Sequence, residues 1–217
     1  MPMPTTKLIE VQKPKKQIGL IQNSIRFLQR EFDRYISEMK EVPWWYNERA
    51  VLGFFTNGLI RNSKNLVLQE FSCVRGKSKG AKNKSGRADI WFQYGNREYL
   101  AEVKLWFSSI DTRTDFDDAY RWASNALKQA NQYDVKEWSV KKANVFALCF
   151  EVIYCKEDSL KKLEDTHLKE WCDKNESKAL DFYYMIYLNH DMLNKKSYFH
   201  YGGYYYPAVA VYGLFNK

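Results

Sequence analysis

The chain has 217 residues, and its 34 Lys and Arg against 26 Asp and Glu give a net charge of +8. That length suits one well-packed domain with additions and argues against two. The positive charge favours anionic partners such as nucleic acid. No stretch of about 20 uncharged apolar residues is present to span a membrane, and the N-terminus lacks a secretory apolar core, which predicts a cytoplasmic protein. The four cysteines and three histidines do not have the spacing of a zinc knuckle or a disulfide framework.

The N-terminal region divides into two parts. Residues 1–16 are rich in Pro and Lys and are predicted to be a mobile segment, followed by a single domain over residues 17–217. Residues 18–40 predict a long amphipathic helix, because their apolar residues recur at helical spacing. We expect this helix to cover the sheet or an end of the core, and the sequence leaves a homodimer open.

The next segments are a helix, a strand and a basic loop. Residues 44–61 follow Pro43, which does not fit inside a helix, and their apolar residues recur at helical spacing. Residues 65–74 predict a strand. The loop over residues 75–87 is the most basic stretch, and it is either a solvated loop or a set of phosphate contacts. We favour DNA contacts, made by Lys77, Lys79, Lys82, Lys84 and Arg87.

Residues 86–94 and 97–105 predict a β-hairpin. Gly95-Asn96 between them suits a two-residue turn that needs positive φ. If the turn pairs the residues on either side of it, Asp89 lies directly opposite Glu102. Side chains alternate along a strand, so Lys104 shares the face of Glu102.

Two directly opposed carboxylates have Cβ atoms roughly 4.5–5.5 Å apart. They repel each other unless a cation neutralises them. A divalent metal between Asp89 and Glu102 would do so, with Lys104 steadying a water or a phosphate oxygen. The alternative is the solvated face of an ordinary hairpin.

The remaining elements complete an α/β pattern. Residues 115–133 predict a helix, and residues 144–155 predict a buried central strand in which Cys149 and Cys155 are buried thiols. A charged helix over 157–178 and strands over 181–188 and 204–214 follow. The expected architecture is a central mixed β-sheet flanked by helices, with the order α-β-β-β-α-β over residues 44–155.

One motif carries a resemblance to a known family. Asp89, followed after twelve residues by Glu102-Val103-Lys104 at the end of an apolar strand, resembles the signature of the PD-(D/E)xK nuclease superfamily. Ala88 stands where the family name has a proline. The element order over residues 44–155 agrees with the restriction-endonuclease-like core of that family.

The resemblance implies a catalytic centre. In it, Asp89 and Glu102 hold Mg²⁺, for which Mn²⁺ substitutes, and the main-chain carbonyl of Val103 completes the metal shell. Lys104 helps to activate the attacking water. The resemblance also implies a further acidic ligand on the first core helix, for which Glu48 is the candidate; an exposed helical Glu is the alternative.

Gln129 and Tyr133 lie four residues apart, so they share one face of their predicted helix. Gln-x-x-x-Tyr at this place resembles an extra motif of the RecB-like branch, where it lies beside the catalytic hairpin. A tyrosine at helical spacing is also typical of a simple core position.

The sequence therefore predicts a Mg²⁺-dependent endo- or exodeoxyribonuclease with Asp89, Glu102 and Lys104 as catalytic residues. A basic nucleic-acid-binding protein without chemistry is the alternative from another class. An RNA-directed nuclease on the same fold is a third reading, because the 2′-OH contacts that distinguish RNA from DNA are not recognisable in one sequence.

Overall fold

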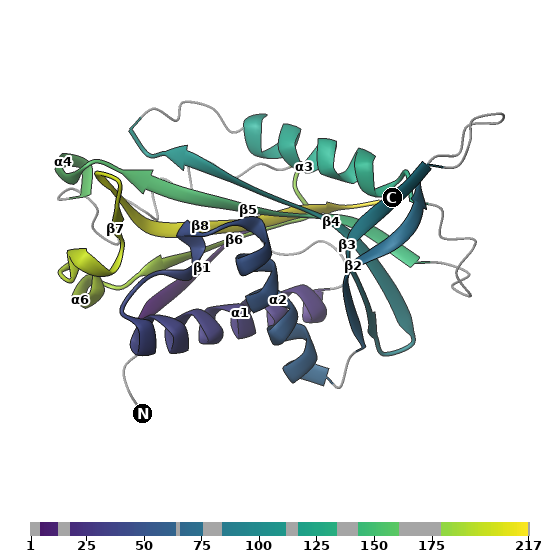
Figure 1. Cartoon of the computed structure of the whole chain (residues 1–217), viewed down its shortest axis with the longest axis horizontal. Coiled ribbons are helices and arrows are strands. Elements are labelled where there is room, and N and C mark those ends of the chain that lie inside the picture. The colour runs from purple at the N-terminus through teal and green to yellow at the C-terminus, as the bar shows by residue number, and fades with distance from the viewer. Residues whose placement is uncertain are drawn as a thin grey trace.

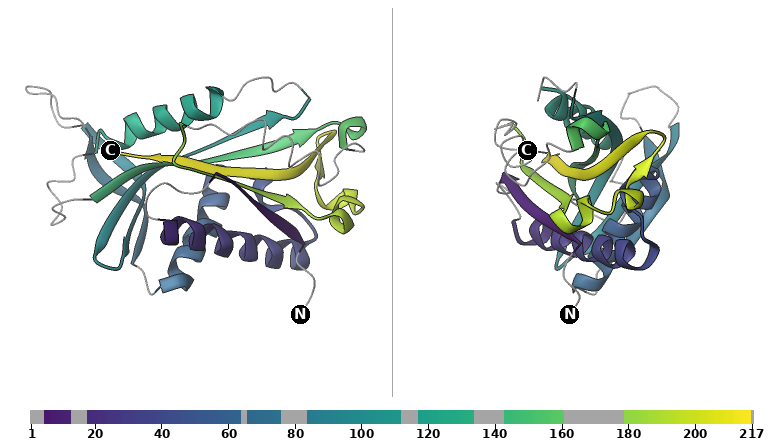
Figure 2. Two further views of the ribbon diagram at one scale, coloured as in Figure 1. Left: turned by 180° about the vertical axis from the view of Figure 1, so that it is seen from behind. Right: turned by 90° about the vertical axis from the view of Figure 1, so that its left-hand side faces the viewer.

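The computed structural model describes residues 5–12, 18–63, 66–75, 84–111, 117–133, 143–160 and 179–216. Within them, eight strands form one mixed sheet in the order β1-β6-β8-β5-β4-β3-β2, with β7 paired to β8 (Figure 1). β4 and β5 run parallel, and the other pairs are antiparallel. Helices α1 and α2 lie on one side of the sheet and α3 on the other (Figure 2). The predicted α/β class is confirmed.

The elements follow the predicted order, with α2, β2, β3, β4, α3 and β5 in succession. The first half of the chain contains β1 (Thr6–Gln12), α1 (Ile18–Met39), the short 3-10 helix η1 (Pro43–Trp45), α2 (Glu48–Ser63), β2 (Val67–Arg75), β3 (Lys84–Tyr94) and β4 (Arg97–Ser109). The second half contains α3 (Asp117–Ala130), β5 (Ala143–Cys155), α4 (Glu157–Leu160), β6 (Phe182–Leu188), α6 (His190–Leu193), η3 (Lys196–Tyr198), β7 (His200–Tyr201) and β8 (Tyr204–Phe215). Most of the helix predicted over residues 157–178 lies outside the described residues.

The prediction of a mobile segment over residues 1–16 is wrong for Thr6–Gln12. These residues form the edge strand β1, antiparallel to β6. Asp33 of α1 holds its start, because the N–H and hydroxyl of Thr6 and the hydroxyl of Thr5 donate to its Oδ1 at 2.7 to 2.8 Å. The composition of the segment suggested disorder, whereas the bonds that order the strand come from a helix elsewhere in the chain.

Helix α2 begins at Glu48 rather than at residue 44. Oδ1 of Asn47 accepts the N–H of Ala50 at 3.0 Å, as expected of a residue that caps a helix N-terminus. Trp44 is instead buried in the preceding turn, where its Nε1 donates to the carbonyl of Tyr206 at 3.0 Å. The cap and the anchored turn together place Glu48 in the first turn of α2.

The core occupies both faces of the central strands, and β6 is buried along its whole length. Cys149 and Cys155 of β5 are buried thiols outside any disulfide, as predicted, and burial raises the pKa of both. Of the helices that the structure describes, none combines the length and apolar character needed to cross a membrane.

Candidate active site at the open edge of strand β4

The candidate site lies where β3 and β4 part. Their ladder runs from Tyr94↔Arg97 to Ile90↔Ala101, which confirms the predicted hairpin register. The ladder stops one pair short of Asp89 and Glu102, so the directly opposed pair predicted from the register is not formed. The carboxylate Oδ2 of Asp89 instead accepts the N–H of Val103 at 2.7 Å. Asp89 therefore takes the place of a backbone partner for β4.

A second carboxylate lies along the same edge of β4. Oε2 of Glu48, from the first turn of α2, accepts the N–H of Leu105 at 3.0 Å. On its other side, β4 stays paired with β5 as far as Ser109. The edge that β3 leaves is thus bonded by two acidic side chains from different elements.

The main-chain carbonyl of Val103 faces this edge as well. In a strand, the N–H and C=O of one residue point to the same side, and the N–H of Val103 points to Asp89. The carbonyl oxygen therefore lies on the side that Asp89 and Glu48 approach.

Glu102 is buried beside this edge, with 2 % of its surface exposed. Its Oε1 accepts a hydrogen bond and salt bridge from Nζ of Lys104 at 2.7 Å. Its Oε2 accepts the hydroxyl of Tyr133, which also lies 3.2 Å from the carbonyl oxygen of Arg87. A buried carboxylate is costly unless it is paired and hydrogen-bonded, and these two donors satisfy that requirement.

The pKa of Glu48 is raised, first by burial and then by the negative charges of Asp89 and Glu102, against the lowering effect of Lys104 and of the Leu105 N–H. The four charged groups therefore form one electrostatic unit.

The pKa of Lys104 is raised as well. Burial acts to lower it, but the hydrogen bond to Glu102 and the charges of Glu102, Asp89 and Glu48 outweigh burial. Lys104 is therefore a fixed cation at neutral pH rather than a base.

Helix α3 brings one of its two predicted accessory residues to the site. Tyr133, just after α3, contacts Glu102 as described above. Gln129 is half-buried on α3. The predicted helix ran to Tyr133, but α3 ends at Ala130, so the two residues do not share a helix face as predicted.

The predicted DNA-binding residues are only partly described. Lys77, Lys79 and Lys82 lie outside the described residues, as does the side chain of Lys84, which begins β3. Arg87 is exposed, and its Nη1 lies 3.3 Å from Oε2 of Glu70.

Glu70 is a partner of Arg87 that was not predicted from the sequence. Glu70, with a φ of 45°, also accepts a salt bridge at 2.6 Å from Nε of Arg49, the residue after Glu48. Arg49 directly follows Glu48 and Arg87 lies two residues before Asp89, and the two arginines share the carboxylate of Glu70. In the sequence, the position of Arg49 directly after Glu48 was the one indication that this arginine lies near the site.

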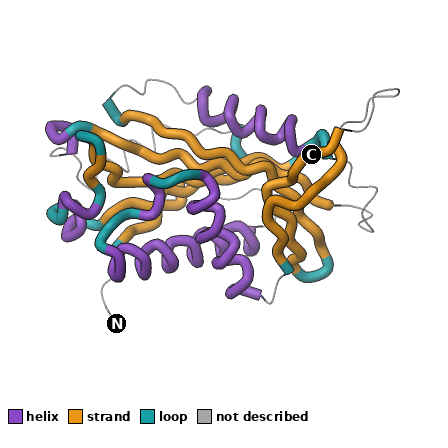
Figure 3. The backbone as a smooth tube through the Cα atoms, viewed as in Figure 1, coloured by secondary structure: helices purple, strands orange, loops and turns teal. Residues whose placement is uncertain are grey.

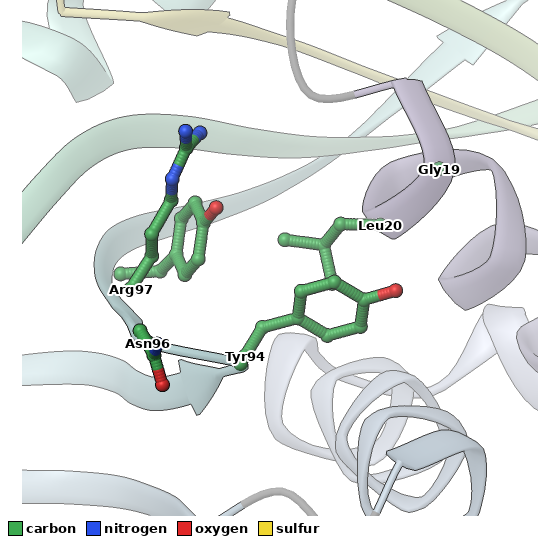
Figure 4. A pocket seen from close by; sticks show the side chains of 7 residues that line it. Gly19, Leu20, Tyr94, Asn96 and Arg97 are labelled. Carbon is green, nitrogen blue, oxygen red and sulfur yellow. The ribbon is translucent and has the colours of Figure 1, made fainter.

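Two cavities that the structure describes lie away from the candidate site. A cavity of about 360 Å³ lies at the far end of the hairpin, between its turn and the start of α1, where Tyr94, Arg97 and Leu20 line it (Figure 4). A second cavity of about 450 Å³ is lined by Glu41, Trp45, Tyr46 and Tyr201. Asp89, Glu102 and Glu48 line neither of these two cavities.

In comparisons with known proteins, no family model, no curated protein and no solved structure matches the chain. Among the described residues, no group of three or more His, Cys, Asp or Glu side chains is arranged to hold a metal ion by itself. A functional assignment therefore depends on the geometry and chemistry of the β4 edge.

Proposed function

We propose that the protein is a metal-dependent nuclease that hydrolyses phosphodiester bonds in DNA, built on the restriction-endonuclease-like core of the PD-(D/E)xK superfamily. The observation that carries the proposal is the meeting of Asp89, Glu102 and Lys104 at the point where β3 leaves β4. Three segments supply the polar groups there: the hairpin, the start of α2 through Glu48, and the end of α3 through Tyr133.

The donor set fits Mg²⁺. The ion prefers oxygen ligands, and proteins usually bind it through one or two carboxylates, with waters and substrate phosphates completing the shell. An all-protein cage of three acids is therefore not required. Asp89, Glu102 and the carbonyl of Val103 would hold the ion, with Glu48 as an outer ligand. When bound, Mg²⁺ neutralises charge at the phosphate and lowers the pKa of a coordinated water.

The protein side chains have separate tasks in this proposal. Lys104 stays protonated because three carboxylates surround it, so it offers a fixed positive charge to a phosphate oxygen that gains charge during hydrolysis. Tyr133 positions Glu102 by donating to Oε2. Asp89 and Glu48 lie along the β4 edge and supply negative charge on the side to which Val103 turns its carbonyl.

The proposal is tested by incubating the protein with supercoiled plasmid and with Mg²⁺, Mn²⁺ or EDTA, scored on a gel for nicked, linear and degraded product. Cleavage in the two metals and none in EDTA is the expected result. Binding without cleavage in any metal would favour the non-catalytic nucleic-acid-binding protein instead. Substituting structured RNA in the same assay separates the RNA-directed alternative.

A further inference from the structure

A cluster of aromatic side chains lies at the surface where segments far apart in the sequence meet. The turn between α1 and α2 runs beside the end of the sheet that carries β7 and the start of β8 (Figure 3). The rings form a connected set, with centroids of neighbouring rings 5.9 to 6.3 Å apart. We call this set the aromatic platform: Trp45, Tyr46, Phe107, Tyr201 and Tyr206.

Three rings of the platform are unusually exposed for their size. Tyr46 and Phe107 are each 45 % exposed, and Tyr201 is 69 % exposed. Single exposed apolar residues are ordinary, but a contiguous exposed group marks an interaction site. Tyr206 is half-buried in β8, whereas Tyr201 of β7 is held mostly at the surface.

The platform is held in place before any ligand binds. Tyr206 is fixed from both sides, because its N–H donates to Phe199 at 2.9 Å and its carbonyl accepts the indole N–H of Trp44. The hydroxyl of Tyr46 donates to Glu41 at 2.6 Å. Ordered rings lose little conformational entropy on binding, so stacking on them is favoured.

The platform adjoins the candidate active site along the chain at two places. Phe107 lies three residues beyond Lys104 on β4, about 10 Å along the strand, and its side chain is on the face opposite to those of Glu102 and Lys104. Trp45 lies three residues before Glu48. A chain that follows the edge of β4 past Asp89 and Glu48 would therefore reach these rings.

Three lysines lie over two tyrosine rings that neighbour the platform in sequence but do not belong to it. Nζ of Lys40 and of Lys195 lie 6.0 and 5.8 Å from the ring centre of Tyr198, and Nζ of Lys196 lies 5.9 Å from that of Tyr205. The one carboxylate lining the cavity, Glu41, already accepts hydroxyl donors from Tyr35 and Tyr46. Because the carboxylate of Glu41 is engaged by these two hydroxyls and lysines lie nearby, we infer that the cavity takes the flat ring of an anionic ligand.

We propose that the aromatic platform stacks the unpaired bases of a single-stranded DNA segment whose scissile phosphate lies at the β4 edge. The inference rests on the proposed nuclease function and names its substrate class: a single strand, or a duplex with an unpaired end. The cavity between Tyr46, Trp45 and Tyr201 has the size of a small-ligand site, which suits one base. The nearby lysines contact the phosphates on either side.

The test measures binding in a Glu102→Gln background, so that cleavage does not interfere. Three labelled probes are compared: an oligothymidylate, an abasic strand of equal length, and a duplex. In the variant Tyr46→Ser/Tyr201→Ser, oligothymidylate affinity should fall about 5- to 150-fold for each base that loses its ring. Affinity for the abasic strand and the duplex should change little, because their phosphates are still bound.

Matched variants separate stacking from damage to the fold. Tyr201→Phe keeps the ring and should bind as the parent does. Tyr120→Ser removes from α3 a ring about as exposed as Tyr46, and no effect is expected there. Unchanged oligothymidylate affinity in a folded double variant, or equal losses for the abasic strand, would overturn the proposal. Competition by tetramethylammonium would assign the cavity to a cationic ligand instead. Ring-dependent binding without plasmid cleavage would refute the nuclease function alone.

Discussion

Glu102 is the residue that depends most on its neighbours, because it is buried and accepts hydrogen bonds from both Lys104 and Tyr133. An amide in its place keeps the shape and one acceptor oxygen but removes the charge. The lysine beside it would lose its nearest counter-charge. A first variant should therefore remove the negative charge of Glu102 and keep the shape of its side chain.

Glu102→Gln should abolish cleavage while leaving a folded protein that still binds DNA. A metal ligand contributes several kcal/mol to catalysis, so turnover should fall by more than about 100-fold. Plasmid cleavage and DNA binding are measured on the same preparation, with Asp89→Asn as a second variant. Normal turnover by either folded variant would remove these residues from the catalytic assignment.

The raised pKa of Glu48 leads to a prediction about stability and pH. Burial and two neighbouring acids raise this pKa above its unfolded value, so the folded state favours the protonated form. Its contribution to stability is complete below pH 4.5 and is lost as pH rises through the folded pKa. Without metal, Glu48→Gln should therefore increase the free energy of unfolding at pH 7 relative to the parent. At pH 4 the difference should shrink.

Urea unfolding at both pH values checks this expectation. Glu38→Gln, in the exposed last turns of α1, serves as a control for a change of net charge. A Glu48→Gln protein that is less stable than the parent at pH 7 would show that the Leu105 bond, rather than the buried charge, decides the contribution of this residue.

At the level of elements, the site exists because β4 continues beyond the point at which β3 leaves it. The N–H groups of Val103 and Leu105 then need acceptors, and carboxylates from β3 and α2 provide them. Acids gathered in this way repel one another in the absence of a cation. A metal ion should therefore bind the folded state, in which these acids lie together, and not the unfolded chain.

Mg²⁺ or Mn²⁺ should raise the melting temperature of the protein, because a ligand that binds only the native state stabilises it. At an ion concentration about 100 times the dissociation constant, the gain is about 2.7 kcal/mol. The variant Asp89→Asn/Glu102→Gln should lose the gain. An equal rise in that double variant, measured by thermal melting with Ca²⁺ and with EDTA as controls, would place the ion elsewhere.

The same elements show what a sequence can predict. The Gly95-Asn96 turn determined the pairing of Tyr94 with Arg97, and Gly95 adopts a φ of 58° as that turn requires. The end of the ladder was not predictable, because it depends on which side chains reach the N–H groups of β4. Strand β1 was missed for a related reason: the acceptor that orders it, Asp33, is about 27 residues away in α1.

Over the whole molecule, the charge and the architecture favour a polymeric anion as the partner. The net charge is +8, and the acids that would bind metal lie along the edge of a strand, where several segments of the chain meet. The assembly of the aromatic platform from separate segments was not predicted from the sequence. Its rings come from segments about 155 residues apart, such as Trp45 and Tyr201, which only the packing of the turn on β8 brings together.

The basic loop before β3 provides the last prediction. Lys77, Lys79, Lys82 and Lys84 are close in sequence to Asp89, yet none occupies a catalytic position. As phosphate contacts they would release counterions, so changing all four to Ala should flatten the slope of log affinity against log salt. The change should reach up to about 0.9 per contact on duplex DNA and about 0.7 on a single strand. The rate at saturating DNA should change little, because the β4 edge is intact.

A control variant that replaces the exposed Arg26 and Arg30 of α1 tests for a general effect of charge. If replacing the four lysines leaves the salt slope unchanged, the loop is merely solvated and does not contact DNA.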